Sequence, residues 1–202
     1  MTTAETVLDA FLGLVAERGF AAVTLRDVAA AADLGLADLY KLYPDKVALL
    51  GAFVARVDAA VLAGTSRQSD PEETARDRLF DVMMRRYDAL KPHRAALAAI
   101  RRGILRDPLL ALTVGPALRR SVAAMLEAAG LPSDGIAGAV RQNGLLVIHN
   151  AVLRVFDRDE TVDLSKTMAA LDSRLKAAER WAQVFERNMT SRPRPEREAR
   201  AS

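Results

Sequence analysis

The sequence contains no cysteine, few aromatic residues and no long apolar run. The absence of cysteine excludes disulfide bonds, thiolate catalysis and cysteine-ligated metal sites. Aromatic residues make up 5% of the chain, whereas alanine, leucine and arginine are abundant, which favours helices over strands. No apolar run approaches the roughly 20 residues of a membrane-spanning helix. The amino terminus has no basic segment followed by an apolar one, so we expect a cytoplasmic protein without a membrane span.

Histidine is also scarce, since His93 and His149 are the only two. No acidic or hydroxyl residue lies at a known catalytic spacing from either of them. Two histidines three or four positions apart, as in helical metal sites, do not occur. We therefore expect no enzyme activity, no bound metal and no cofactor.

Apolar residues, in contrast, are plentiful. They make up 50% of the 202 residues, which is enough to build a core in one domain or in two closely packed ones. Apolar residues recur at helical spacing along most of the chain. We expect an all-α protein of about nine helices.

Residues 24–43 have the pattern of two short helices joined by a turn. Thr24 and Asp27 have the spacing of a capping box, which predicts that a helix begins immediately after Thr24. Gly35 suits the turn, and an apolar and aromatic pattern then resumes over residues 36–42. This spacing predicts a helix-turn-helix.

Three segments in this part of the chain, VLDAFLGLVAERGF, TLRDVAAAAD and LYKLYPDKVALL, resemble the DNA-binding domain of TetR-type transcriptional regulators. The resemblance implies a homodimer whose second short helix enters the major groove of a palindromic DNA operator. It also implies a larger domain that binds a small apolar effector, as in a ligand-responsive regulator, and most simply a repressor. The implied DNA contacts are Thr24, Arg26, Gly35, Leu36, Ala37, Asp38, Tyr40, Lys41, Tyr43 and Lys46.

Within that set, Tyr40, Tyr43 and Lys46 are expected mainly to hold phosphates, and Lys41 is the one donor suited to a base edge. The resemblance, together with the lack of large apolar residues in the tail, divides the chain into three parts. These are a helix-turn-helix domain over residues 1–45, a helical effector-binding and dimerisation domain over 46–189, and a disordered tail over 190–202.

A second interpretation stays open, in which the protein has this fold but binds a lipid or quinone and no DNA. The segments ADLGLADLYKLYPD and, more loosely, DLSKTMAALDSRL resemble the ubiquinone-biosynthesis lipid-binding proteins that share the TetR fold. Residues 1–50 contain four basic and seven acidic side chains, so their formal charge is 4 − 7 = −3. DNA-binding surfaces are normally basic. This acidic charge and Asp38 favour the second interpretation.

Polar residues interrupt an apolar helix predicted over about residues 134–156. If they are buried, each needs a hydrogen-bond partner. They could satisfy each other, or backbone groups, across a dimer contact. They could instead line an effector pocket of apolar walls and few polar anchors. The residues of such a pocket would be Met83, Met84, Tyr87, Ile100, Asn143, Val147, His149 and Asn150.

The last predicted helix, over about residues 164–189, has apolar residues alternately three and four positions apart. This is the a/d spacing of a coiled coil. The resemblance implies that two helices of each subunit form a four-helix dimer interface, although the stripe could also pack inside the monomer. The expected interface residues are Gly144, Met168, Leu171, Leu175, Ala178, Ala182 and Phe185.

Two further helix boundaries are predicted from proline residues. Asp70 and Pro71 predict a helix start, with Asp70 as the cap and Pro71 as the first helical residue. Gly115 and Pro116 predict a bend or break in the helix that starts after Asp107.

Overall fold

The computed structural model describes residues 3–65 and 72–190, the last nine of them as backbone only. These residues form nine α-helices and one 3-10 helix, which confirms the all-α prediction. The predicted tail lies outside the described residues except for Thr190, the last residue of α9. The helices are α1 (Thr3–Arg18), α2 (Leu25–Ala31), α3 (Leu36–Leu42), α4 (Lys46–Ala63), α5 (Ala75–Leu90), η1 (Lys91–His93), α6 (Arg94–Arg106), α7 (Pro108–Ala128), α8 (Gly135–Phe156) and α9 (Ser165–Thr190).

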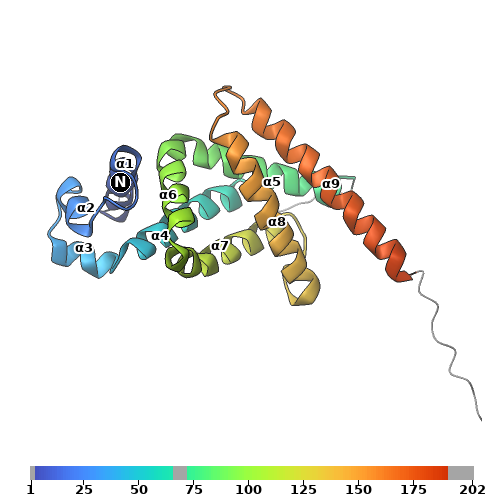
Figure 1. Ribbon diagram of the computed structural model, residues 1–202, viewed down its shortest axis with the longest axis horizontal. Helices are drawn as coiled ribbons and strands as arrows, with labels where there is room; N and C mark the ends of the chain where they lie inside the picture. Colours follow the sequence, from blue (N-terminus) through green and yellow to red (C-terminus); the bar gives the residue numbers. More distant parts are fainter. Residues whose placement is uncertain (1–2, 66–71, 191–202) are drawn as a thin grey trace, which may run out of the picture.

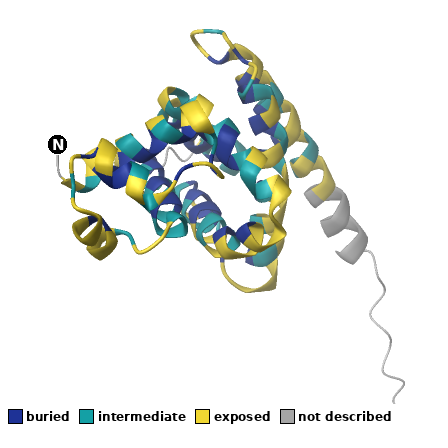
Figure 2. Cartoon of the chain, turned by 60° about the vertical axis from the view of Figure 1, so that its left-hand side comes forward, coloured by how far each residue is buried: buried dark blue, intermediate teal, exposed yellow. Residues whose placement is uncertain are grey.

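The helices are arranged as a small unit beside a larger bundle (Figure 1). Helices α1 to α3 form the small unit at one end, and α4 runs from it into the bundle, where it packs against α5 and α7. Helix α9 packs against α5 and α8 on the far side of the bundle, and its carboxyl-terminal half extends away from the other helices. Figure 2 shows the buried residues on the inward faces of the helices and the exposed residues on the outer surface.

The small unit has the predicted helix-turn-helix structure. Thr24 Oγ1 accepts a hydrogen bond from the backbone N–H of Asp27 at 3.2 Å, and the Asp27 carboxylate accepts one from the Thr24 N–H at 2.8 Å. The capping box is therefore confirmed. Leu39 of α3 is completely buried against the core of the unit, together with Val28 of α2 and Phe11 of α1. This packing fixes the direction in which α3 presents its other side chains.

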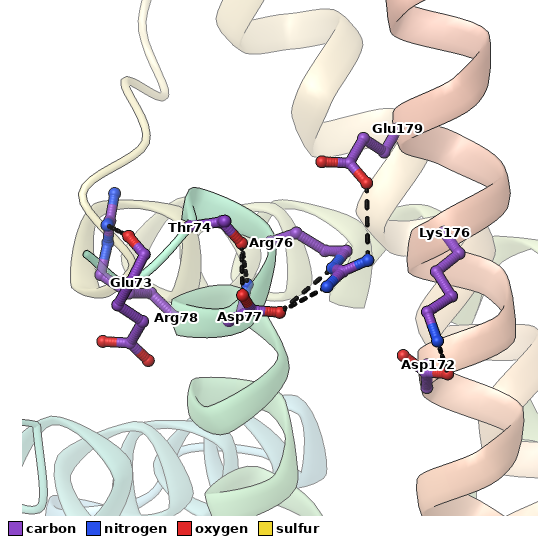
Figure 3. Close-up of polar contacts among 8 residues, drawn as sticks. All are labelled: Glu73, Thr74, Arg76, Asp77, Arg78, Asp172, Lys176 and Glu179. Carbon is purple, nitrogen blue, oxygen red and sulfur yellow. Dashed lines mark hydrogen bonds and ion pairs between the residues drawn. The ribbon is translucent and has the colours of Figure 1, made fainter.

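The prediction of a helix start at Asp70 is wrong. Thr74 caps α5, since its side chain accepts a hydrogen bond from the backbone N–H of Asp77, and Asp70 and Pro71 lie outside the described residues. A threonine followed three positions later by an acid is the stronger capping signal. Arg76 binds Asp77 and reaches Glu179 of α9 at 3.6 Å, which ties the start of α5 to α9 (Figure 3).

The predicted break at Gly115 and Pro116 is also wrong, because α7 continues through both. Pro116 cannot donate to the carbonyl of Leu112, but both residues are exposed, so water can satisfy that carbonyl. Val114 and Val122 are buried on the two sides of the proline and hold the helix in place.

Because α7 is continuous, it is longer and more apolar than the sequence indicated. By length and composition alone its 21 residues could cross a membrane, with a mean hydropathy of 1.3 over the most apolar stretch, 28% of which is buried. In this fold α7 packs against α4, α5, α6 and α8. We therefore interpret α7 as a packing helix of the bundle.

Candidate functional site

Helix α3 presents an exposed face on the small unit. Tyr40 is 60% exposed, and Leu36 and Leu42 are close to half exposed. Thr24, Arg26, Gly35, Ala37, Asp38 and Lys41 are exposed as well, whereas Tyr43 and Lys46 are only partly so. A seven-residue helix with one buried leucine and an exposed aromatic residue is suited to contact a groove rather than to close a core.

The charged residues of this face are paired with each other. Lys41 Nζ donates a hydrogen bond to Asp38 Oδ1 at 2.7 Å, and both side chains are well exposed. The hydrogen bond and the opposite charge lower the pKa of Asp38 and raise the pKa of Lys41. Both groups are therefore ionised at neutral pH, and the pair is dipolar with no net charge.

Lys46 is bonded within the protein. Its Nζ donates to the backbone carbonyl of Phe20 at 3.0 Å and lies 4.6 Å from the centre of the Phe20 ring. Partial burial lowers the pKa of the Lys46 amine. Lys46 thus connects the first turn of α4 to the segment between α1 and α2. The two residues are 26 positions apart, and the sequence did not predict this contact.

The small unit is joined to the bundle by direct side-chain contacts. Arg56 of α4 donates to Asp9 of α1 at 2.5 Å, and its Nη2 lies 3.2 Å from Nε2 of His93. On α6, Gly103 lies close to Phe20, since a Cβ at this glycine would come within 3.2 Å of the Phe20 ring. Helix α1 therefore packs against both α4 and α6, and these contacts join the small unit to the bundle.

The polar groups inside the bundle include two that contain neighbouring residues of α5. The Tyr87 hydroxyl and Nδ1 of His149 are 2.9 Å apart and hydrogen-bonded, and both residues are buried. Burial, followed by the charges of Arg86 and Arg101, lowers the pKa of His149 to about 3, so this imidazole is neutral. Burial also raises the pKa of Tyr87. The pair is a neutral hydrogen bond in an apolar setting.

The second group is ionic. Arg86 Nη1 donates to Asp58 Oδ1 at 2.5 Å, and Ser121 Oγ donates to the same oxygen at 2.6 Å. Arg86 is only 5% exposed. The three residues come from α5, α4 and α7, so the group connects three helices at their contact.

The structure divides the predicted pocket residues between the interior of the bundle and the exposed side of α8. Met83, Tyr87, Ile100 and His149 are buried in the bundle, and Met84 is partly buried against it. Asn143, Val147 and Asn150 are exposed on the other side of α8, where Asn150 Nδ2 donates to the carbonyl of Leu146 in its own helix. The exposed residues are therefore not brought together with the Tyr87–His149 pair.

The exposed side of α8 is unusually apolar. Ile136 is 89% exposed, and Val140 and Val147 follow it four and eleven positions later on the same helical face, next to Asn143 and Gly144. The spacing of these apolar residues in the sequence is the signal that would have identified the face.

The predicted a/d residues of α9 are likewise divided between buried and exposed positions. Leu171 and Leu175 are buried within the monomer, whereas Met168, Ala178 and Trp181 are exposed. The side chains of Ala182 and Phe185 lie outside the described part of the structure. Across residues 3–65 and 72–181, whose side chains are described, no three His, Asp or Glu side chains gather as a metal site.

The helix-turn-helix unit matches a known family. Residues 7–53, which run from within α1 through α2 and α3 to Phe53 of α4, match the family model of the bacterial regulatory proteins of the tetR family. The helix-turn-helix unit is of the TetR type. The proteins that this model describes are bacterial regulatory proteins, and the exposed α3 is the second helix of the matched helix-turn-helix.

Solved structures extend the TetR likeness to the larger bundle. A TetR transcriptional regulator from Nitrosomonas europaea superposes with a TM-score of 0.71 at 22% identity, over 87% of this chain and 97% of that one. A TetR regulator from a Rhodococcus species gives 0.59 at 22% identity, over 86% and 95%. One from Streptomyces coelicolor gives 0.57 at 17% identity, over 95% and 90%. No curated protein sequence matches the chain significantly. At these identities the structures show the fold alone, and over most of the chain it is the fold of these TetR regulators.

Proposed function

We propose that the protein is a dimeric, ligand-responsive repressor of transcription. In this proposal residues 1–45 bind one half of a palindromic operator, and residues 46–189 bind an effector and form the dimer. The observation that supports it most directly is the exposed face of α3, with Tyr40 60% exposed beside Lys41 on a unit fixed by a capping box. Tyr40 and Thr24 would bind phosphates, and Lys41 would contact a base edge.

The exposed apolar face of α8 supports the dimer. Ile136, Val140 and Val147 would be covered by the same face of a second subunit, with Gly144 allowing close approach of the two helices. Met168, Ala178 and Trp181 of α9 would extend this contact, whereas Leu171 and Leu175 are already used inside the monomer.

The interior of the bundle supports an effector site near the Tyr87–His149 pair. Met83 and Ile100 are buried apolar residues of the predicted set, and one neutral hydrogen-bonded pair suits an apolar ligand with a single polar group. Asp58 of α4 binds Arg86, the residue before Tyr87, so a ligand that displaces α5 would also displace α4. Because α4 continues into the small unit, this displacement would change the separation of the two α3 helices in a dimer.

A mobility-shift assay with the full-length protein and the DNA upstream of its own gene tests the proposal. We expect a discrete complex that unrelated duplex does not compete away at moderate salt. Lys41→Ala should weaken the complex, whereas Lys166→Ala, which removes an exposed lysine from the start of α9, should leave it unchanged. Binding no tighter than to unrelated duplex would contradict the proposal.

The dimer is tested separately by sedimentation. Val140→Glu places a charge in the apolar face of α8 and should convert a dimer to a monomer. Arg141→Glu changes the neighbouring exposed residue and is the control. A wild-type monomer at micromolar concentration would contradict this part of the proposal.

A second candidate function is lipid or quinone binding without DNA binding. It is favoured by the net charge of −3 over residues 1–50 and by the pairing of Lys41 with Asp38. Mass spectrometry of the purified protein would then detect a bound lipid or quinone, and the mobility shift would be absent. Specific DNA binding together with ligand-free protein would exclude this candidate.

A further inference from the structure

The Asp38–Lys41 pair presents one acceptor and one donor side by side on the exposed surface of α3. The ammonium nitrogen and the carboxylate oxygen are 2.7 Å apart. Residues three positions apart lie on the same side of a helix, so both groups can meet one surface. Their neighbours Leu36, Ala37 and Leu42 have no polar side-chain atoms and cannot compete for hydrogen bonds.

A G·C base pair presents a matching arrangement in the major groove. Guanine offers two adjacent acceptors, N7 and O6, and cytosine offers the N4 donor beside them. O6 and N4 are joined by a Watson–Crick hydrogen bond, so their separation is about 2.9 Å. The spacing of the protein pair and that of the base-pair edge are therefore nearly equal.

We propose that Asp38 and Lys41 act together as a specificity-determining pair that selects a G·C base pair in each operator half-site, with Lys41 donating to guanine and Asp38 accepting from cytosine N4. This inference rests on the proposed DNA binding. It gives Asp38 a positive function in selection, although its charge faces a polyanion.

An A·T pair fits the same side chains less well. Its edge has the order acceptor, donor, acceptor and methyl group, so no two acceptors are adjacent for the lysine. An ammonium group beside N6 can therefore meet a single acceptor, adenine N7 or thymine O4, where guanine offers it two, and the thymine methyl crowds O4. One good contact of this type discriminates against the wrong base pair by about 5- to 150-fold.

Simple repulsion between Asp38 and the phosphates predicts a different result. A charge that only repels phosphates weakens binding to every sequence equally, because phosphate contacts contain no base information. A charge that binds cytosine strengthens binding to one sequence and weakens binding to others. The two effects are separated by measuring base preference and affinity in the same variants.

The experiment is selection of binding sites from a random duplex pool by the full-length protein, followed by affinity measurements on the selected site. For the wild type we expect a palindrome with one invariant G·C pair per half-site, whose replacement by A·T weakens binding about 5- to 150-fold. Asp38→Asn should move the preference at that position towards A·T, because an amide pairs with adenine N6 and N7. Asp38→Ala should weaken binding to the selected site and reduce selection at that position.

Asp33→Asn is the matched control. It removes the same charge from the turn before α3, where the backbone φ of 53° is tolerated by asparagine. We expect an unchanged base preference for this variant. Thermal unfolding should show the same midpoint for all these proteins, since both aspartates are exposed.

Two results would overturn the inference. If Asp38→Ala and Asp38→Asn tighten binding equally to selected and random duplex and change no base preference, Asp38 only repels phosphates and the proposed repressor function stands. If the wild type enriches no sequence at all, both the inference and the proposed DNA binding fail.

Discussion

The two regions of the molecule each contain an acidic and a basic side chain in contact, in opposite surroundings. Asp38 and Lys41 on α3 are exposed, whereas Arg86 is 5% exposed where it meets Asp58 in the bundle. The exposed pair can exchange its internal hydrogen bond for a bond to another molecule at little cost, because water already solvates both groups. The buried pair cannot, because separating the charges leaves one of them unsolvated.

The same contrast holds for the rest of each region. The helix-turn-helix unit is stabilised by local contacts, such as the capping box of Thr24 and Asp27, and by an apolar core. The bundle contains polar partners that come from distant parts of the chain, 28 residues apart for Asp58 and Arg86 and 62 apart for Tyr87 and His149. The exposed groups of the first region are available to bind another molecule. The buried polar pairs of the second region would be disturbed if a bound molecule separated their helices.

Removal of one partner from the buried pair should give the largest loss of stability. Asp58→Ala leaves the Arg86 charge and the Ser121 hydroxyl without their acceptor, and we expect the free energy of unfolding to fall by about 3–5 kcal/mol. Denaturant unfolding measures this loss. Lys41→Ala breaks the exposed pair in the same assay and should not move the midpoint measurably. Equal effects of the two variants would show that the surroundings of the pairs do not differ as described.

Glycine positions provide a second comparison between the regions. A Cβ on Gly138 of α8 would lie 2.0 Å from the backbone carbonyl oxygen of Ser133, whereas a Cβ on Gly13 of α1 would meet nothing within 4 Å. Gly138→Ala should therefore destabilise the protein by about 1–3 kcal/mol. Gly13→Ala should stabilise it by about 0.5–1 kcal/mol, because alanine restricts the unfolded chain. Thermal unfolding of both variants would detect the opposite signs, and a loss of stability in both would contradict the packing of α1.

The change in the free energy of unfolding with pH should depend on His149 in the interior of the bundle. Because the pKa of His149 is lowered from 6.5 to about 3, only the unfolded chain binds this proton between those values. The free energy of unfolding should therefore decrease as the pH falls below 6.5, by up to about 1.4 kcal/mol per pH unit. Denaturant titrations between pH 7 and 5 measure the decrease before the carboxylates begin to titrate.

His149→Gln is the variant that sharpens this prediction, since an amide can still bond to the Tyr87 hydroxyl. This variant should lose most of the decrease in the free energy of unfolding between pH 7 and 5. His93→Gln should remove less, because His93 is only partly buried and its pKa is lowered mainly by that partial burial. A pH profile of His149→Gln identical to that of the wild type would mean that His149 does not stay neutral in the folded protein.

Local signals in the sequence were enough to predict the all-α fold and the helix-turn-helix of the small unit. Thr24 with Asp27 and the apolar spacing predicted the start of α2 and the bounds of α3, because caps depend on residues a few positions apart. The left-handed residue of the turn is Asp33, with a φ of 53°, and not the predicted Gly35, whose φ is −66°. The same kind of signal failed at Pro116, where exposure of the proline and packing on both sides of it overcome its tendency to break a helix.

The candidate sites could be predicted only in part. His149 was predicted as a polar residue that needs a partner, but its partner Tyr87 and the exposure of Asn143 and Asn150 depend on how α8 is rotated in the bundle. Helix α8 has apolar residues on both faces, so its periodicity does not determine which face is buried. Asp58 in the apolar pattern of α4 was a signal of a buried partner that the sequence offered, but Arg86 could not be identified without the fold.

The most direct test of the account is the ratio of dissociation constants of the full-length protein for its upstream DNA and for a shuffled duplex of equal length. Fluorescence anisotropy at a single, physiological salt concentration measures both. If the exposed face of α3 recognises an operator, the upstream DNA should bind at least about 1,000-fold more tightly. Equal dissociation constants would show that this helix-turn-helix does not recognise DNA sequence there, and would contradict the central claim.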